Sequence, residues 1–153
     1  MKSLFISLSL ILTLTLSYSQ NNWKTFNGKY GFKIDLPDYF QLGSLTRSGI
    51  QYFNTTRHPR LIIGVETSET LSEVKAIEEL NRYYLALLKT QTGITDNIKK
   101  DREFTISSKN GDEFMYIKSI LRNTKMYTLN IQYPLFEKNY VESIITHISE
   151  SLD

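Results

Sequence analysis

The sequence predicts an α+β fold, in which an antiparallel sheet of about six strands is packed by two main helices. Short runs of alternating apolar and polar residues, separated by hairpin signals such as Asn27-Gly28 and Asn110-Gly111, predict the strands. Two longer segments, one in mid-chain and one at the C-terminal end, carry apolar residues at helical spacing. Strands, then a helix, then a strand meander and a final helix is an order typical of α+β proteins.

The first 19 residues have the features of a cleavable signal peptide. Lys2 is the only charged residue before Lys24, and residues 4–16 are all apolar, Ser or Thr. This run is shorter than the roughly 20 apolar residues that a membrane-spanning helix needs. Ser17 and Ser19 are small enough for a signal peptidase, so we expect cleavage before Gln20. An uncleaved anchor and a buried core helix are the alternatives.

Cleavage leaves residues 20–153, which we expect to form a single α+β domain that is exported to the periplasm or secreted. The chain contains no cysteine, so its stability depends on packing alone and a lipid cannot be attached at an N-terminal cysteine. Its formal net charge of +2 is too small to indicate the basic surface that is typical of nucleic-acid-binding proteins. We therefore expect no nucleic-acid partner and no transmembrane segment after cleavage.

The first strands of the mature chain are predicted from their alternation. Residues 30–36 place apolar side chains at alternate positions, and Pro37 ends this run. Residues 50–53 make a short strand. Residues 61–65 are apolar on both faces, which predicts a strand in the interior of the sheet.

A helix over roughly residues 71–91 follows. Thr70 and Glu73 have the spacing of a capping box, and Gly93 is a plausible stop. The apolar stripe of this helix consists of Leu71, Val74, Ile77, Leu80, Tyr84, Leu87 and Leu88.

Three more strands and a second helix complete the chain. The strands cover residues 104–107, 114–121 and 127–133, and apolar residues on both faces of 114–121 place that strand in the interior. The last helix carries an apolar stripe from Tyr140 to Leu152, with Asn139 and Glu142 as a possible cap.

No pattern for catalysis, a metal or a cofactor stands out. The two histidines, His58 and His147, are far apart, and no cluster of ligand residues has metal-site spacing. The segment 42–45 lacks the second glycine of a nucleophile elbow. A paired-carboxylate site stays open, yet no acidic residue stands in an apolar strand that would raise its pKa. We therefore expect that the protein is not an enzyme.

The one basic concentration is Arg57, His58 and Arg60, with Arg47 expected nearby across a hairpin. These three residues are the candidate ligand-binding residues, since a basic loop can contact an anion or a partner. The alternative, which we favour, is that these residues form a solvated turn between two strands. Five tyrosines could either line a groove for a ligand or pack their rings in the core, and tyrosines at strand positions more often pack in the core. They are Tyr52, Tyr84, Tyr116, Tyr127 and Tyr133.

The chain resembles the PsbP-like and Mog-type domains, including exported bacterial members of the DcrB type. The resemblance begins with the pattern W-x-x-F-N-x-x-Y-G-F-x-I-x-L-P, from Trp23 to Pro37, and continues to the pattern Y-x-L-x-I-x-Y-P at 127–134. It covers nearly the whole mature chain in order and spacing. It implies an antiparallel sheet packed by helices and an accessory or binding role rather than catalysis, without carrying over any site residue.

Three functions stay open from the sequence. The first is a non-catalytic accessory protein that binds another macromolecule, for example an envelope protein. The second is a carrier of a small ligand in a pocket lined by tyrosine and phenylalanine, and the third is a hydrolase of an unrecognised kind. A tyrosine-lined cavity with converging polar groups would favour the carrier.

Overall fold

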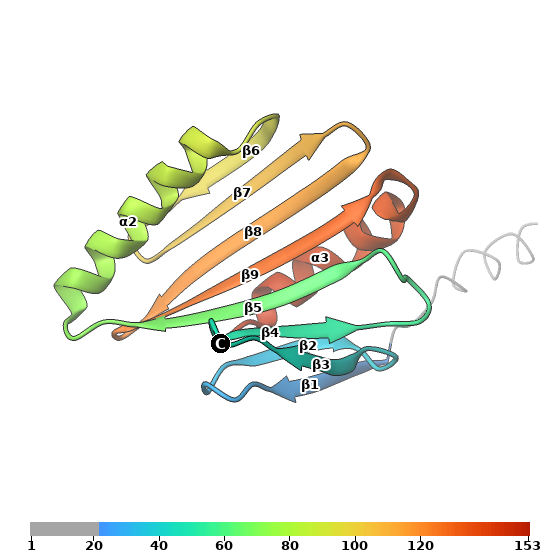
Figure 1. Cartoon of the computed structure of the whole chain (residues 1–153), viewed down its shortest axis with the longest axis horizontal. Coiled ribbons are helices and arrows are strands. Elements are labelled where there is room, and N and C mark those ends of the chain that lie inside the picture. Colours follow the sequence, from blue (N-terminus) through green and yellow to red (C-terminus); the bar gives the residue numbers. More distant parts are fainter. Residues whose placement is uncertain (1–21) are drawn as a thin grey trace, which may run out of the picture.

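The computed structural model describes residues 22–153, so the predicted signal peptide lies outside the described residues. Figure 1 shows the arrangement of the elements. They follow one another as β1 (Trp23–Asn27), β2 (Lys33–Pro37), β3 (Gln41–Leu45), β4 (Ile50–Asn54), β5 (Ile62–Glu69), α2 (Glu73–Thr90), β6 (Ile94–Lys99), β7 (Glu103–Asn110), β8 (Glu113–Arg122), β9 (Lys125–Pro134), η1 (Leu135–Glu137) and α3 (Lys138–Ser151).

Seven strands form one antiparallel sheet in the order β3-β4-β5-β9-β8-β7-β6, and β1 and β2 form a separate hairpin. The predicted α+β class with an antiparallel sheet and two helices is confirmed, although there are more strands than the sequence predicts. Strand β9 lies at the centre, flanked by β5 and β8. These two flanking strands are the ones whose apolar residues on both faces predicted an interior position.

The two faces of the sheet have different covers (Figure 1). One face packs against α3 and the β1–β2 hairpin, and the other packs against α2. Strand β8 serves both layers because its side chains alternate: Ile120 belongs to the α3 layer, whereas Ile117 and Leu121 belong to the α2 layer. Helix α2 covers the β6–β8 half of its face and leaves much of β5 and β9 uncovered by any helix.

The hairpin and α3 join the two ends of the described chain. Phe32, Ile34 and Leu36 are fully buried in the same core as Ile148 of α3. The backbones of Lys33 and Asp153 exchange two hydrogen bonds, of 2.6 Å and 3.0 Å. The β1–β2 hairpin is therefore held by residues more than 100 positions further along the chain.

The ends of both helices differ from the sequence prediction. Ser72, and not Thr70, caps α2: its hydroxyl accepts a hydrogen bond from the Lys75 N–H, while the Thr70 hydroxyl donates to the Ser72 carbonyl. The prediction that Leu71 and Val74 begin the buried stripe is wrong, since they are 95% and 67% exposed.

The predicted cap of the last helix is also wrong. Helix α3 begins at Lys138, directly after the 3-10 turn η1, and no side chain caps its first turn. The turn η1 continues into α3 and supplies the preceding helical residues, so Asn139 lies inside the helix and cannot cap it.

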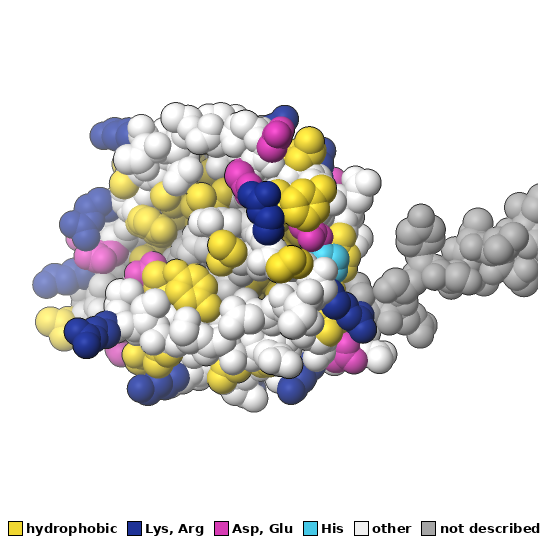
Figure 2. All heavy atoms as spheres, turned by 45° about the vertical axis from the view of Figure 1, so that its right-hand side comes forward, with side chains coloured by type: hydrophobic (Ala, Val, Ile, Leu, Met, Phe, Trp, Pro, Cys, Tyr) yellow, Lys and Arg dark blue, Asp and Glu magenta, His cyan; other side chains and the backbone are white. Residues whose placement is uncertain are grey.

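The surface carries both signs of charge. Figure 2 shows hydrophobic side chains near the middle of one face, with basic and acidic side chains interspersed around them. Such mixing agrees with the small net charge of the chain. Among residues 22–153, none of the helices is both long enough and apolar enough to span a membrane.

Candidate functional site

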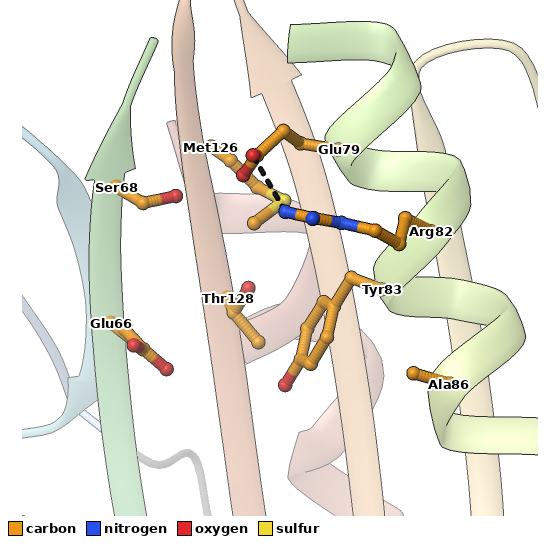
Figure 3. A pocket seen from close by; sticks show the side chains of 8 residues that line it. All are labelled: Glu66, Ser68, Glu79, Arg82, Tyr83, Ala86, Met126 and Thr128. Atoms are coloured by element: carbon orange, nitrogen blue, oxygen red, sulfur yellow. Dashed lines mark hydrogen bonds and ion pairs between the residues drawn. The ribbon is translucent and has the colours of Figure 1, made fainter. Parts of the chain in front are cut away.

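A groove lies between α2 and the uncovered part of the sheet (Figure 3). It has a volume of about 400 Å³, which is in the range of small-molecule sites. Three elements line it: β5, β9 and one flank of α2. The lining residues are Glu66, Ser68, Glu79, Arg82, Tyr83, Ala86, Met126 and Thr128.

The helix wall of the groove follows from helical geometry. Residues 79, 82, 83 and 86 are spaced three and four apart, so they share one flank of α2. This flank adjoins the buried stripe that contains Ala76, Leu80 and Leu87. Ala86 is small, so the helix wall leaves room at that position.

The sheet wall follows from the alternation of β5 and β9. Ile63 and Val65 point into the α3 layer, so Glu66 and Ser68 point to the α2 side. The buried Thr128 of β9 lies opposite Glu66 in the strand register. Its hydroxyl is hydrogen-bonded to Ser119 at 2.8 Å, which fixes the floor of the groove.

Next to the groove, Gly64 of β5 has no side chain and leaves room for Tyr52 of β4. Tyr52 lies opposite Gly64 in the register, and a Cβ at Gly64 would come within 3.3 Å of the Tyr52 ring and of Ile50. Glycine inside a strand often marks a place where another group approaches the backbone closely. Here the ring of Tyr52 is that group.

The three charged residues of the groove differ in whether their charge is paired with another residue. Arg82 Nη2 donates a hydrogen bond of 2.7 Å to Glu79 Oε1, so these two charges offset each other (Figure 3). Within residues 22–153, the side chain of Glu66 makes no ion pair and no hydrogen bond. Glu66 therefore gives the groove an uncompensated negative charge.

The pKa of the Tyr83 hydroxyl reflects the nearby charge of Glu66. Burial raises the pKa of the Tyr83 hydroxyl, and the negative charge of Glu66 raises it further. The ring of Tyr83 also packs near Phe104, with 5.9 Å between the ring centroids. The ring is thereby held by the core while its hydroxyl is directed into the groove (Figure 3).

The predicted basic residues lie elsewhere, at the β4–β5 loop. Arg57 lies over the ring of Tyr39, with its Cζ 4.5 Å from the ring centroid, and Arg60 pairs with Glu113. His58 Nδ1 is in close hydrogen-bonded contact with Glu137 Oε2. The structure thus brings each of the three into contact with its own partner within the chain. Arg47 does not join them, because β4 separates its turn from this loop.

The predicted tyrosines lie mostly in the core and none lines the groove. Tyr127 and Tyr133 are buried, and Tyr116 packs against the α3 layer. Tyr84 packs against Phe104. Tyr83, which the apolar stripe of the sequence did not include, is the tyrosine of the groove.

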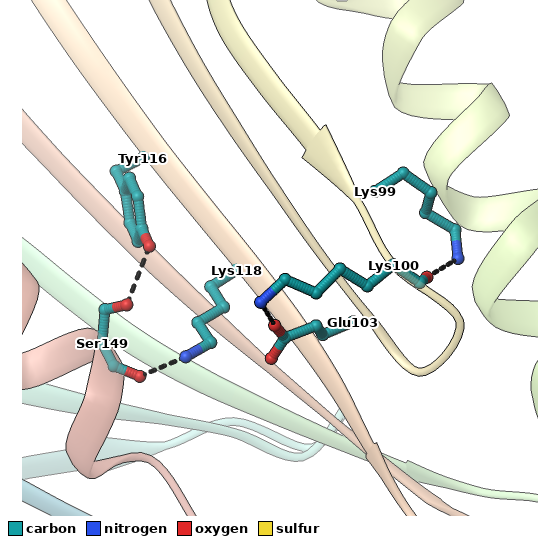
Figure 4. Close-up of polar contacts among 6 residues, drawn as sticks. All are labelled: Lys99, Lys100, Glu103, Tyr116, Lys118 and Ser149. Carbon is teal, nitrogen blue, oxygen red and sulfur yellow. Dashed lines mark hydrogen bonds and ion pairs between the residues drawn. The ribbon is translucent and has the colours of Figure 1, made fainter.

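A second polar cluster lies on the opposite face, beside the last turn of α3 (Figure 4). Lys118 Nζ donates to the Ser149 carbonyl at 2.6 Å, and the Tyr116 and Ser149 hydroxyls are 2.8 Å apart. Burial lowers the pKa of Lys118. A lysine bonded to a carbonyl in the last turn stabilises a helix end, so this cluster attaches α3 to β8. Within residues 22–153 no group of three potential ligand residues could hold a metal ion.

The comparisons with known proteins bear on the fold. No family model matches the chain, and no curated protein matches it in sequence. Among solved structures, cyanobacterial PsbP (CyanoP) from Synechocystis sp. PCC 6803 matches with a TM-score of 0.60 at 10% identity, covering 90% of this chain and 95% of that chain. The chain has the PsbP-like fold. The fold that the sequence resemblance implied is confirmed.

A second solved structure also matches. It is LpqN, described as involved in cell envelope biogenesis of Mycobacterium tuberculosis, with a TM-score of 0.49 and 13% identity over 89% of this chain and 86% of that chain. At such identities the likeness concerns the PsbP-like fold, and the function has to be argued from the groove.

Proposed function

We propose that this chain is an exported, non-catalytic binding protein whose ligand occupies the groove between α2 and strands β5 and β9. The observation that carries the proposal is the groove itself: about 400 Å³, with an apolar body and a few converging polar groups. The apolar part consists of Met126, Ala86 and the ring of Tyr83. The polar part consists of the Tyr83 hydroxyl and the side chains of Glu66, Ser68, Glu79, Arg82 and Thr128.

The groove favours binding over hydrolysis. Glycoside hydrolysis needs two carboxylates in separate roles. The groove holds two, Glu66 and Glu79, but Arg82 engages Glu79. The groove holds no histidine that could serve as a base.

Export supports the same proposal in a different way. We propose that residues 1–19 are removed and that residues 20–153 act as one domain in the periplasm or outside the cell. A protein that binds and releases a small molecule needs no cofactor for this role, and the PsbP-like fold leads us to expect an accessory role of this kind.

Blocking the groove tests the proposal. A fragment library screened by ligand-observed NMR should give hits that bind the wild-type protein and not the variant Ala86→Trp, because the indole would fill the space beside Ala86. Asn81→Trp adds the same ring on the outer side of α2 and should keep the hits. Hits that bind both variants equally would place the site elsewhere and contradict the proposal.

A macromolecular partner is the second candidate, favoured by exposed apolar residues on α2 and just before it. Val74 and Leu85 of α2 are 67% and 54% exposed, and Leu71, which precedes the helix, is 95% exposed. Large apolar side chains that face solvent along one helix are a feature of docking surfaces. A photo-crosslinking amino acid at position 74 should then capture one envelope protein that the same group at Lys125 does not capture. Equal yields at the two positions would contradict a partner on α2.

A further inference from the structure

The charge of Glu66 identifies the chemical class of the ligand. A carboxylate that lines a groove without a cationic partner gives that groove a negative potential, which favours a ligand of opposite charge. Among residues 22–153 no cation pairs with Glu66, and the one arginine of the groove is bonded to Glu79. A ligand that brings a positive charge would restore the missing interaction.

The neighbours of Glu66 distinguish between kinds of cation. Tyr83 offers a hydroxyl oxygen on the Glu66 side of the groove, where the charge of Glu66 reaches it, whereas Ser68 lies toward the opposite end (Figure 3). A primary ammonium can donate one N–H to the carboxylate and another to this hydroxyl. A quaternary ammonium has no donor and prefers a cage of several aromatic rings, whereas this groove has one ring, that of Tyr83.

The remaining lining suits an aliphatic stem. Met126 supplies a flexible thioether, and Ala86 and the face of Tyr83 complete an apolar wall. The hydroxyl of Thr128 is already bonded to Ser119, so the floor offers little to a second polar group. An anionic ligand would face Glu66 without compensation, because Glu79 offsets Arg82.

We propose that the ligand of this groove carries a primary ammonium group on an aliphatic chain, with the ammonium held by Glu66 and Tyr83 and the chain lying against Met126 and Ala86. This inference rests on the groove being the binding site. The ammonium lies between β5 and α2, and the chain runs along the groove. The ligand could be a free alkylamine or a lysine-like side chain, which share this chemistry.

Three probes of equal length and different charge test the inference: n-hexylammonium, 1-hexanol and hexanoate. Each is titrated into the ¹⁵N-labelled mature protein and followed by amide chemical shifts. We expect n-hexylammonium to shift the amides of Glu66, Ser68 and Tyr83 with an apparent Kd at least about ten-fold lower than that of 1-hexanol. Hexanoate should bind most weakly of the three.

Charge variants complete the test. Glu66→Gln keeps the size of the side chain and removes its charge, so the preference for n-hexylammonium over 1-hexanol should disappear. Glu78→Gln removes the same charge from the outer side of α2 and should keep the preference. To separate free amines from peptides, N-acetyl-lysine amide is compared with n-hexylamine: tighter binding of the lysine derivative indicates a protein side chain as the natural ligand, and tighter binding of the alkylamine a free amine.

The outcomes separate this inference from the proposal on which it rests. If 1-hexanol or hexanoate binds in the groove as tightly as n-hexylammonium, the ammonium preference is wrong and the groove remains a binding site. If no probe shifts a groove amide and the fragment screen also finds no ligand that Ala86→Trp blocks, the ammonium preference and the proposed binding function are both contradicted.

Discussion

The imidazole of His58 lies flat against the ring of Tyr140, with 3.8 Å between the ring centroids and an angle of 3° between the planes. Stacking holds the imidazole so that Nδ1 faces the carboxylate of Glu137. Because η1 and α3 carry Glu137 and Tyr140, this one contact attaches the β4–β5 loop to the start of α3. Glu137 is only 7% exposed, which makes the attachment costly to disrupt.

Glu137→Gln should lower the free energy of unfolding by about 2 kcal/mol, because the buried contact with His58 loses the negative charge of the carboxylate and keeps only an amide oxygen as acceptor. Urea denaturation measures the change. Glu142→Gln is the matched control: Glu142 pairs with Lys138 on the same helix but is half exposed, and its loss should cost less than about 0.5 kcal/mol. Equal effects of the two substitutions would mean that the Glu137 pair adds no stability.

Tyr39, beside His58, should ionise only at very alkaline pH. Burial raises the pKa of Tyr39 to about 12, aided by the charges of Asp38 and Glu137, while Arg57 opposes the rise. The spectrum of the wild type minus that of Tyr39→Phe should therefore show one tyrosine with a midpoint near pH 12. A midpoint near pH 10 would contradict this environment.

The same shift makes stability depend on pH. The tyrosine in the unfolded chain loses its proton near pH 10 and in the folded chain near pH 12. The contribution of Tyr39 is thus fully present below pH 10 and is lost as the pH rises toward 12. The wild type should lose stability in this window relative to Tyr39→Phe, whose side chain cannot ionise.

Glu66→Gln should lower the pKa of Tyr83, because the charge of Glu66 is one of the two causes that raise it. The difference spectrum against Tyr83→Phe, recorded in each background, gives this pKa. Glu78→Gln should leave the pKa of Tyr83 where it is in the wild type. An unchanged pKa in Glu66→Gln would show that the carboxylate points away from the groove.

Position 93 requires glycine for two reasons: its backbone has a positive φ, and there is no space for a side chain. Its φ is +65°, and a Cβ would lie 2.0 Å from the carbonyl oxygen of Lys109. Gly93→Ala should cost about 3 kcal/mol of unfolding free energy, measured in urea. Gly111→Ala is the control, since Gly111 has a φ of +60° but nothing within 4 Å of a Cβ, so only the backbone cost of about 1 kcal/mol remains. Equal costs would show that Lys109 moves aside freely.

We predict that the mature chain begins at Gln20, after removal of the proposed signal peptide. Intact-mass spectrometry of the protein recovered from periplasm and medium should give the mass of residues 20–153. Ser19→Trp should abolish this product, because a bulky side chain at the cleavage site is not accepted. Lys24→Trp, beyond the site, should leave cleavage unaffected. A full-length mass in the wild type would favour the uncleaved anchor.

The strands that could be predicted from the sequence are the buried ones, because burial requires apolar residues at regular positions. The interior strands β5, β8 and β9 are rich in apolar residues, and the sequence located all three. Strand β6 was not predicted because it is an edge strand whose side chains are mostly exposed, so nothing demands an apolar alternation. The same holds for β3 at the opposite edge.

The groove could not be predicted as a unit, since its residues come from three separate segments and none has an unusual neighbourhood in the sequence. One local signal pointed toward it: Tyr83 stands on the flank of α2 between its apolar and charged sides. Which charge stays unpaired depends on the packing of α2 against β5, and only the structure gives that.

The pairing of Lys33 with Asp153 has a consequence for how the polypeptide is made. A chain leaving the ribosome exposes its first hairpin long before the helix that buries Phe32 and Ile34 has been translated. Contacts between sequence-distant segments form slowly, so this hairpin stays without its partner until α3 has been translated. A chain that folds so late suits the export that we propose, because threading through a narrow pore requires unfolded polypeptide.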